Sequence, residues 1–345
     1  MDAKDHYVLP SALRTMSTRS FLKWAGGKHR VARDLIEIIK KNPPHGIDWY
    51  VQNDESYHEP MLGSGSMYFQ LIENQIIKNQ KSVLGDINKS IICAMKVLSK
   101  KRNLDPLISM LTNLQEKYPK DSPHPNPRNQ DKDVRNRRMF YRKRRKLNRL
   151  IKKIETLSPT EKIELTSLVI FLNKTCYNGL WRMNSKGEFN TPEGNYDNPS
   201  NICQPSVLKR CHELLKSCSI RVRDWKKGLQ ASKPGDLVYL DPPYMPLKFG
   251  ENTFTDYHTD GFDMDDQIEL AKEAAKAAKR GVRIIASNHD ARGAPNIEEI
   301  YNSAAEEVGI GKPVIEQIKV SRTINCKGHG RVKVNEVLIF LYHRN

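Results

Sequence analysis

Apolar residues in the first third of the chain alternate between short β-rich runs and longer stretches with helical spacing. One run lies near residues 56–62 and precedes a glycine turn and a stretch whose apolar positions fit a helix. A second run, residues 82–85, precedes another such stretch that continues to residue 98. Parallel strands joined by right-handed helical crossovers give this β-α-β-α order. We therefore expect an α/β fold with a doubly wound, Rossmann-like sheet.

This pattern breaks in the middle of the chain. Residues 119–135 are rich in Pro, Asn, Asp and Arg, which predicts a loop. Apolar positions 147, 150, 151 and 154 then predict a helix over residues 139–157, with basic residues on its opposite face. A second helix should end near Asn173, and a polar segment rich in Gly and Asn follows at 174–201.

The α/β pattern resumes after this interruption. Helices are expected at 207–215 and 265–280, and strands at 219–223, 237–240, 282–286, 314–320 and 334–342, the last two as a closing hairpin. The chain therefore divides into a loosely structured tail, one split α/β domain and a mainly helical insertion: residues 1–17, residues 18–112 with 206–345, and residues 113–205.

A carboxylate follows the apolar run 237–240, at the start of Asp241-Pro242-Pro243-Tyr244. Ligands of open α/β sheets bind beyond the carboxyl ends of the strands. The two prolines fix the backbone and remove two N–H donors, so this rim is rich in acceptors and has an aromatic ring beside it. Such a rim suits a purine with its amino group, although a strand-ending turn explains the same tetrapeptide.

A glycine turn and a second carboxylate indicate a cofactor site. Gly63 and Gly65 lie between a strand and a helix, and Asp86 ends the next strand. An acidic side chain at that point can accept hydrogen bonds from ribose hydroxyls. The third glycine of the dinucleotide fingerprint is absent, so a nucleoside without phosphate fits better. A plain tight turn, and an Asp86 that caps a helix, remain alternative explanations.

Residues 21–28 add a third element, Phe-Leu-Lys-Trp-Ala-Gly-Gly-Lys. Trp24 can stack on an adenine, and the glycine pair lets the backbone approach a ligand closely. Lys28 can pair with a carboxylate, such as that of an amino-acid moiety. A surface turn with a partly buried indole is the alternative.

The charge of the chain predicts a polyanionic partner. Its 345 residues include 57 Lys and Arg against 40 Asp and Glu, a net charge of +17. Charge of this size favours nucleic acid as the partner. A membrane is disfavoured, because the longest apolar stretch runs only from about Ser167 to Leu172. The N-terminus lacks a signal-peptide core, and the six cysteines have no zinc-like spacing, so we expect an intracellular, cytoplasmic protein without a metal.

Basic residues concentrate in the insertion. Residues 128–153 contain 13 Lys or Arg and two Asp. A solvated helix face would explain them, but phosphate contacts are favoured, with Arg144, Arg145 and Arg149 as candidates.

The motifs together resemble the Dam-type DNA adenine-N6 methyltransferases in order and over most of residues 20–342. The matching segments are 21–28, 59–66, Asp86-Ile87-Asn88, 173–196, 241–244, 254–259, 287–290 and 320–342. Any one of these motifs is weak, whereas the ordered set is specific.

The resemblance implies S-adenosylmethionine as cofactor and a flipped adenine as substrate. Asp241 and the carbonyl oxygen of Pro242 would accept hydrogen bonds from N6, Pro243 would stiffen the rim, and Tyr244 would stack on the base. The positions implied to bind the cofactor are Trp24, Lys28, Gly63, Gly65, Asp86 and Asp241.

The resemblance also implies a target, the palindrome GATC, in double-stranded DNA. Tyr177 and Asn178 would fill the hole left by the flipped base, and Lys23 would read the first guanine. Arg182 would donate to guanine O6 and N7, while Leu180 and Pro192 would contact a thymine methyl.

The sequence departs from the family pattern at two points, and two alternative functions remain open. Asn195 stands where close relatives usually carry Arg, and the basic segment is longer than is usual for the family. A DNA-binding protein without catalysis would share the charge and the loop. A cytosine-N4 methyltransferase could use the same acceptors. No obligate protein partner is evident.

Overall fold

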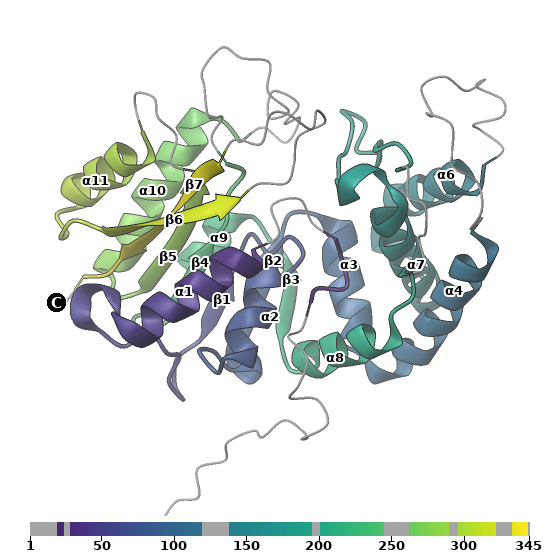
Figure 1. The fold of residues 1–345 in the computed structure, drawn as a ribbon, viewed down its shortest axis with the longest axis horizontal. Helices are drawn as coiled ribbons and strands as arrows, with labels where there is room; N and C mark the ends of the chain where they lie inside the picture. Colours follow the sequence, from purple (N-terminus) through teal and green to yellow (C-terminus); the bar gives the residue numbers. More distant parts are fainter. Residues whose placement is uncertain are drawn as a thin grey trace, which may run out of the picture.

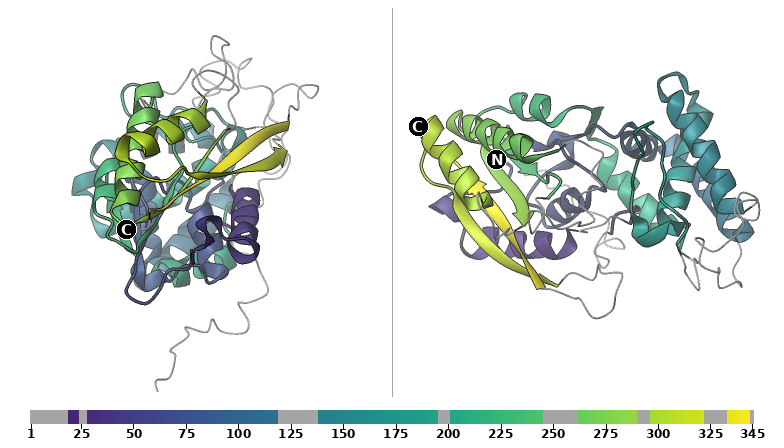
Figure 2. Two further views of the ribbon diagram at one scale, coloured as in Figure 1. Left: turned by 90° about the vertical axis from the view of Figure 1, so that its left-hand side faces the viewer. Right: turned by 90° about the horizontal axis from the view of Figure 1, so that it is seen from above.

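The computed structural model describes residues 19–23, 28–118, 138–194, 201–244, 262–289, 296–321 and 333–343. Figure 1 shows two parts, a twisted sheet with helices on both faces and a group of helices beside it. The right-hand view of Figure 2 shows the same separation from above.

The sheet has seven strands in the order β3-β2-β1-β4-β5-β7-β6. Their bounds are β1 (Tyr57–Glu59), β2 (Ser82–Asp86), β3 (Ser219–Val222), β4 (Leu237–Leu240), β5 (Arg283–His289), β6 (Val314–Ser321) and β7 (Lys333–Leu341). The first five are parallel, and β7 lies antiparallel between β5 and β6. From β1 the chain builds outward in one direction through β2 and in the other through β4, so the topological switch point lies between β1 and β4.

Strand β4 explains why both faces of the sheet are covered. All four of its residues are buried, with Leu237 and Tyr239 in one apolar core and Val238 and Leu240 in the other. The first core includes residues of α1 (His29–Lys41), α2 (Ser66–Glu73), α3 (Lys89–Leu98) and α8 (Pro205–Leu215). The second includes residues of α9 (Trp225–Gln230), α10 (Met264–Lys279) and α11 (Ile297–Val308). The expected Rossmann-like α/β fold is confirmed.

The helical part is built around α7 (Pro159–Thr175), which packs against α3, α4 (Leu104–Lys117) and α6 (Met139–Lys152). Short 3-10 turns connect elements in both parts: η2 (Pro44–Gly46), η3 (Asn79–Lys81), η4 (Lys101–Asn103), η6 (Ile154–Thr156) and η7 (Tyr177–Gly179). Within the described residues, none of the helices is long and apolar enough to cross a membrane.

Two boundaries differ from the expected ones. The helix expected over 139–157 ends at Lys152, because Ser158 and Glu161 form a capping box that starts α7 with Pro159 in its first turn. Helix α4 was not expected at all, and the expected domain boundary at residue 113 falls inside it. Its buried leucines pack it against both α7 and α8, so it joins the helical part to the sheet. The proposed tail and loop, residues 1–17 and 119–135, lie outside the described residues.

Candidate active site

The carboxylate of Asp241 lies directly after β4, next to the switch point of the sheet. Its Oδ1 accepts hydrogen bonds from Lys28 Nζ and Ser287 Oγ, each at 3.0 Å. The Ser287 hydroxyl also contacts the buried Tyr239 phenol at 2.8 Å. Burial raises the pKa of the Asp241 carboxyl, while Lys28 and Ser287 lower it. A quarter of the side chain remains exposed, so an incoming group can reach this carboxylate.

Lys28 joins Asp241 to a second, deeply buried carboxylate, that of Glu336 on β7. Its Nζ lies 3.5 Å from Glu336 Oε2 and 3.9 Å from the centroid of the Tyr244 ring. The Tyr244 phenol donates to the same Oε2 at 2.9 Å. Lys28 was expected to meet a cofactor carboxylate, but here its ammonium pairs with two carboxylates of the protein.

The backbone of the Asp-Pro-Pro-Tyr segment is fixed from the side of α10. Gln267 Nε2 donates to the carbonyl oxygen of Pro243 at 2.6 Å, and Asn288 Nδ2 donates to Gln267 Oε1 at 3.1 Å. The Tyr244 ring meets the His289 ring edge-on, with centroids 4.3 Å apart. Tyr244 therefore has a defined orientation beside Asp241.

Asp86 and the glycine turn form the neighbouring part of the edge. Asp86 Oδ2 accepts from the Gly63 N–H and Oδ1 from the Asn88 N–H, both at 2.8 Å. Asn88, and not Asp86, caps α3. Gly65 has a φ of +70°, and an added Cβ would lie 3.4–3.5 Å from three side chains, so glycine suits this position. The turn and the two strand ends are thus held together, whereas Trp24 lies outside the described residues.

A fourth carboxyl, that of Glu59 at the end of β1, is almost completely buried. Tyr57 donates its phenol to Glu59 Oε2 at 2.6 Å. Burial raises the pKa of Glu59 well above its ordinary value, and the negative charge of Asp241 adds to the increase. Of three adjacent strands, β1 and β2 therefore end in Glu59 and Asp86, and Asp241 directly follows β4.

The polar residues after α7 form a short hairpin, residues 177–194, which we call the 177–194 hairpin. Cys176 bridges to Glu193 and Met183 to Phe189, and the Trp181 and Phe189 rings lie 4.5 Å apart. The Tyr177 N–H donates to the carbonyl oxygen of Pro192 at 2.9 Å. The hairpin therefore brings together five of the six residues expected to take part in base recognition, all except Lys23: Tyr177, Asn178, Leu180, Arg182 and Pro192.

Asn173 connects this hairpin to the segment that precedes the expected cofactor loop. Its buried amide accepts from the Lys23 N–H and donates to the Lys23 carbonyl oxygen, both at 2.7 Å. The same amide donates to the carbonyl oxygen of Gly179 at 3.1 Å. A Cβ added to Gly179, whose φ is +67°, would lie 2.7 Å from Lys23 Cγ. Lys23 thus packs directly against the turn of the hairpin.

The basic helix α6 supports the hairpin from the other side. Arg144 Nη1 donates to the carbonyl oxygens of Asn190 and Thr191, each at 3.2 Å. Asn148 exchanges two hydrogen bonds with the backbone of Phe189, at 3.1 and 2.9 Å. Arg144 therefore has contacts within the protein, while Arg145 and Arg149 are exposed. A phosphate contact for these arginines stays a prediction.

Sequence reasoning did not single out three of these groups: Ser287, Glu336 and Asn173. A lone glutamate in the apolar strand 333–341 was the available signal for Glu336. Asn173 opens the segment 173–196 that resembles the family, but nothing in the sequence indicated its contact with Lys23, which is 150 residues away.

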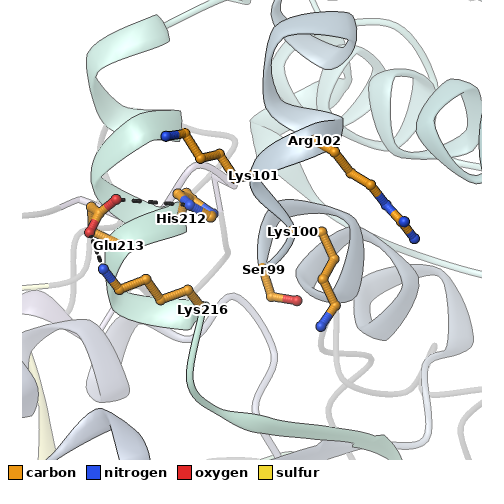
Figure 3. A pocket seen from close by; sticks show the side chains of 7 residues that line it. All are labelled: Ser99, Lys100, Lys101, Arg102, His212, Glu213 and Lys216. Carbon is orange, nitrogen blue, oxygen red and sulfur yellow. Dashed lines mark hydrogen bonds and ion pairs between the residues drawn. The ribbon is translucent and has the colours of Figure 1, made fainter.

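A separate cavity of about 670 Å³ lies at the opposite edge of the sheet, where α3 and α8 end (Figure 3). It is lined by Ser99, Lys100, Lys101, Arg102, His212, Glu213 and Lys216. Glu213 pairs with Lys216 at 2.6 Å. The cavity adds to the positive surface but contains none of the residues around Asp241.

A Rossmann-like sheet with an acceptor-rich Asp-Pro-Pro-Tyr rim at its switch point is the framework of a methyltransferase. The sequence model of the D12 class of N6 adenine-specific DNA methyltransferases matches residues 24–313, and the chain belongs to this family. Family membership decides between the alternatives: the protein is an adenine-specific DNA methyltransferase, and neither a DNA-binding protein without catalysis nor a cytosine-N4 enzyme.

Individual relatives match along nearly their whole length. The chain is 34% identical to the type II methyltransferase M.MjaIII of Methanocaldococcus jannaschii over 328 residues, which cover 95% of this chain and 100% of the relative. It is 28% identical to the type II methyltransferase M1.LlaDCHI of Lactococcus lactis subsp. cremoris, covering 95% and 96%. It is 30% identical to the DNA adenine methylase of Serratia marcescens, covering 93% and 97%.

Proposed function

We propose that this DNA adenine methyltransferase uses S-adenosylmethionine to methylate the flipped-out adenine of GATC in double-stranded DNA. The observation that carries the proposal is the Asp241 carboxylate, partly exposed at the end of β4 beside the oriented Tyr244 ring. The names of the relatives, type II methyltransferase and DNA adenine methylase, agree with a DNA substrate. A DNA substrate also supports a place in the cytoplasm.

The residues around Asp241 suit the chemistry of an amine. Adenine N6 is a poor nucleophile, since its lone pair is delocalised into the ring. The Asp241 carboxylate and the Pro242 carbonyl would each accept one N6–H hydrogen bond, which favours a pyramidal nitrogen with an available lone pair. N6 loses one proton when it gains the methyl group. Asp241 is an acceptor within reach, and burial raises its pKa in the direction that favours accepting a proton.

The neighbouring strand ends suit the cofactor, which when bound supplies an electrophilic methyl group on a sulfonium. Asp86 would accept hydrogen bonds from ribose hydroxyls, and the turn at Gly63 and Gly65 would let the cofactor approach the backbone. The left-handed backbone of Gly65, with a φ of +70°, supports this arrangement, because a residue with a side chain would be strained there. Trp24 would complete the site, and Lys28, paired with Asp241 and Glu336, would lie beside it.

We assign recognition of the target to the 177–194 hairpin and Lys23. Arg182 and Lys23 would donate to guanine, Leu180 and Pro192 would contact a thymine methyl, and Tyr177 with Asn178 would replace the flipped base. The packing of Lys23 against Gly179 supports a single reading surface. The inserted domain would then be the target-recognition domain.

Mapping of N6-methyladenine tests this assignment directly. Unmethylated genomic DNA is incubated with the protein and S-adenosylmethionine and then sequenced for modified bases. Methylation at the adenine of GATC supports the proposal. Methylation in another sequence would reject the target while keeping the reaction, and no transfer at all would reject the cofactor or the activity.

A further inference from the structure

Glu336 has an unusual position for an acidic residue, since it lies in the middle of an apolar strand. Only 3% of its side chain is exposed, and on β7 it pairs with His289 of β5. A buried carboxylate is costly unless it is paired and hydrogen-bonded. Both partners described for it, Lys28 and Tyr244, belong to the proposed methylation site.

The two partners meet at the same oxygen of Glu336. Oε2 accepts the phenol of Tyr244 at 2.9 Å and lies 3.5 Å from Lys28 Nζ. The ammonium in turn lies 3.9 Å from the centroid of the Tyr244 ring. Glu336 therefore fixes the direction of the ring that is expected to stack on the base, and it provides a counter-charge for Lys28.

Lys28 also occupies two groups that the substrate needs, the Asp241 carboxylate and one face of the Tyr244 ring. Its ammonium contacts Asp241 Oδ1 at 3.0 Å and covers a face of the Tyr244 ring. A flipped adenine requires the same acceptor for its amine and the same ring for stacking. An adenine that stacks on the covered face of the ring displaces the ammonium, and a bare ammonium in a buried site is unfavourable. Glu336 is close enough to keep it paired after a small movement.

We propose that Glu336 is a positioning residue of the methylation site, which orients Tyr244 and takes over Lys28 from Asp241 when the adenine enters. This inference rests on the proposed function. It gives Lys28 two positions, one on Asp241 in the empty site and one on Glu336 in the loaded site.

Substitution of Glu336 by Gln tests the charge, because the amide oxygen can still accept the Tyr244 phenol. We expect the single-turnover rate of methyl transfer to fall roughly ten- to a hundredfold, the range for a lost hydrogen bond to a charged group. Total methyl incorporation into unmethylated genomic DNA is the assay. Because this assay counts methyl groups at every site, the wild-type rate tests the proposed methyl transfer independently of the target sequence. No transfer by the wild type would reject the proposed function, whereas equal rates would reject only the role of Glu336.

The pH profile separates a charge role from a structural one. The groups that affect the ionisation of Asp241 are Lys28, Ser287 and Glu336, with Glu59 and Tyr239 also close. Glu336 raises the pKa of Asp241, so Glu336→Gln should move the acid limb of the rate profile to lower pH. A merely loosened fold would lower the rate without moving this limb, and that result would overturn the proposal.

Two further variants complete the experiment. Tyr244→Phe removes the phenol and keeps the ring, so Glu336→Gln should slow the enzyme again in that background. If the double variant is no slower than Tyr244→Phe, Glu336 acts through the phenol alone and the transfer of Lys28 is wrong. Glu316→Gln removes the same charge from the neighbouring strand β6, opposite Leu338, and should leave rate and pH profile unchanged.

Discussion

The sheet edge and the 177–194 hairpin hold their functional side chains in opposite ways. At the edge, Lys28 contacts both Asp241 and Glu336, and all three side chains are largely withdrawn from solvent. In the hairpin, Asn178 is exposed and Tyr177 half-buried, while Asn148 of α6 and the buried Asn173 of α7 hydrogen-bond to its backbone.

This difference fits the two tasks. Methyl transfer requires charges and acceptors already in place, because their reorganisation would add to the barrier. Base recognition requires side chains at the protein surface, where they can contact DNA, on a backbone that is held in a fixed position. Changes at the edge should therefore affect the rate on every sequence, and changes in the hairpin should affect the choice of sequence.

The largest effect should follow Asp241→Ala. Loss of the acceptor for the target amine should lower methyl transfer at least about a thousandfold, at the upper end of the cost of one oxyanion-hole donor. The loss should be the same on all DNA sequences, and DNA binding should remain. Methyl incorporation measures the loss of transfer, and a gel-shift titration measures DNA binding. Near-normal turnover would refute the proposed mechanism.

Asn173→Ala should damage both regions, because its amide joins them. The change leaves the N–H and C=O of Lys23 and the carbonyl of Gly179 without this partner, at about 1–3 kcal/mol for each buried group left unpaired. We expect a lower melting temperature, weaker S-adenosylmethionine binding without DNA, and methylation at near-cognate sites.

Asn148→Ala is the matched control for that variant. It removes an equivalent pair of hydrogen bonds, to Phe189, without a contact to residue 23. Near-cognate methylation should rise while cofactor binding stays normal. If Asn173→Ala likewise leaves cofactor binding normal, the two regions are not coupled through this amide.

Arg182→Ala should relax the target sequence. One bidentate contact to guanine is worth about 1–3 kcal/mol of discrimination. Competition between GATC and sites altered at one base pair measures the loss. A rate that falls equally on all sites would instead make Arg182 a phosphate contact or a structural residue.

The smallest effect should come from the basic helix α6, and here neighbouring arginines can be compared. Replacement of the exposed Arg145 and Arg149 by Gln should flatten the plot of log K against log[salt] by up to about 0.9 unit for each lost phosphate contact. Target choice should not change. Arg144→Gln should change the target choice and leave the salt slope unchanged, because the Arg144 side chain donates hydrogen bonds to the hairpin backbone at residues 190 and 191. An unchanged salt slope in the double variant would mean that this face only solvates the helix.

The sequence was sufficient for the parts of the molecule that depend on local pattern. The apolar run before Asp241 predicted β4 and the place of the Asp-Pro-Pro-Tyr tetrapeptide, and the spacing from Gly63 to Asp86 predicted two strand ends side by side. Each of these inferences needs only strand periodicity and the rule that ligands bind at the carboxyl ends of parallel strands.

Contacts between distant segments could not be predicted in this way. The closing hairpin was expected, but not that β7 would lie inside the sheet, next to β5, and bring Glu336 to Lys28. Helix α4 was not predicted, although its leucines have helical spacing. The partners of Asn173 follow from the packing of α7, which no local signal encodes.

The interior position of β7 has a consequence during protein synthesis. Domains fold on the ribosome as their segments emerge. A growing chain can already contain Lys28, Asp241 and β5, yet it lacks the strand that pairs with β5 and carries Glu336. The site around Lys28 and Asp241 is therefore complete only after translation has passed residue 341.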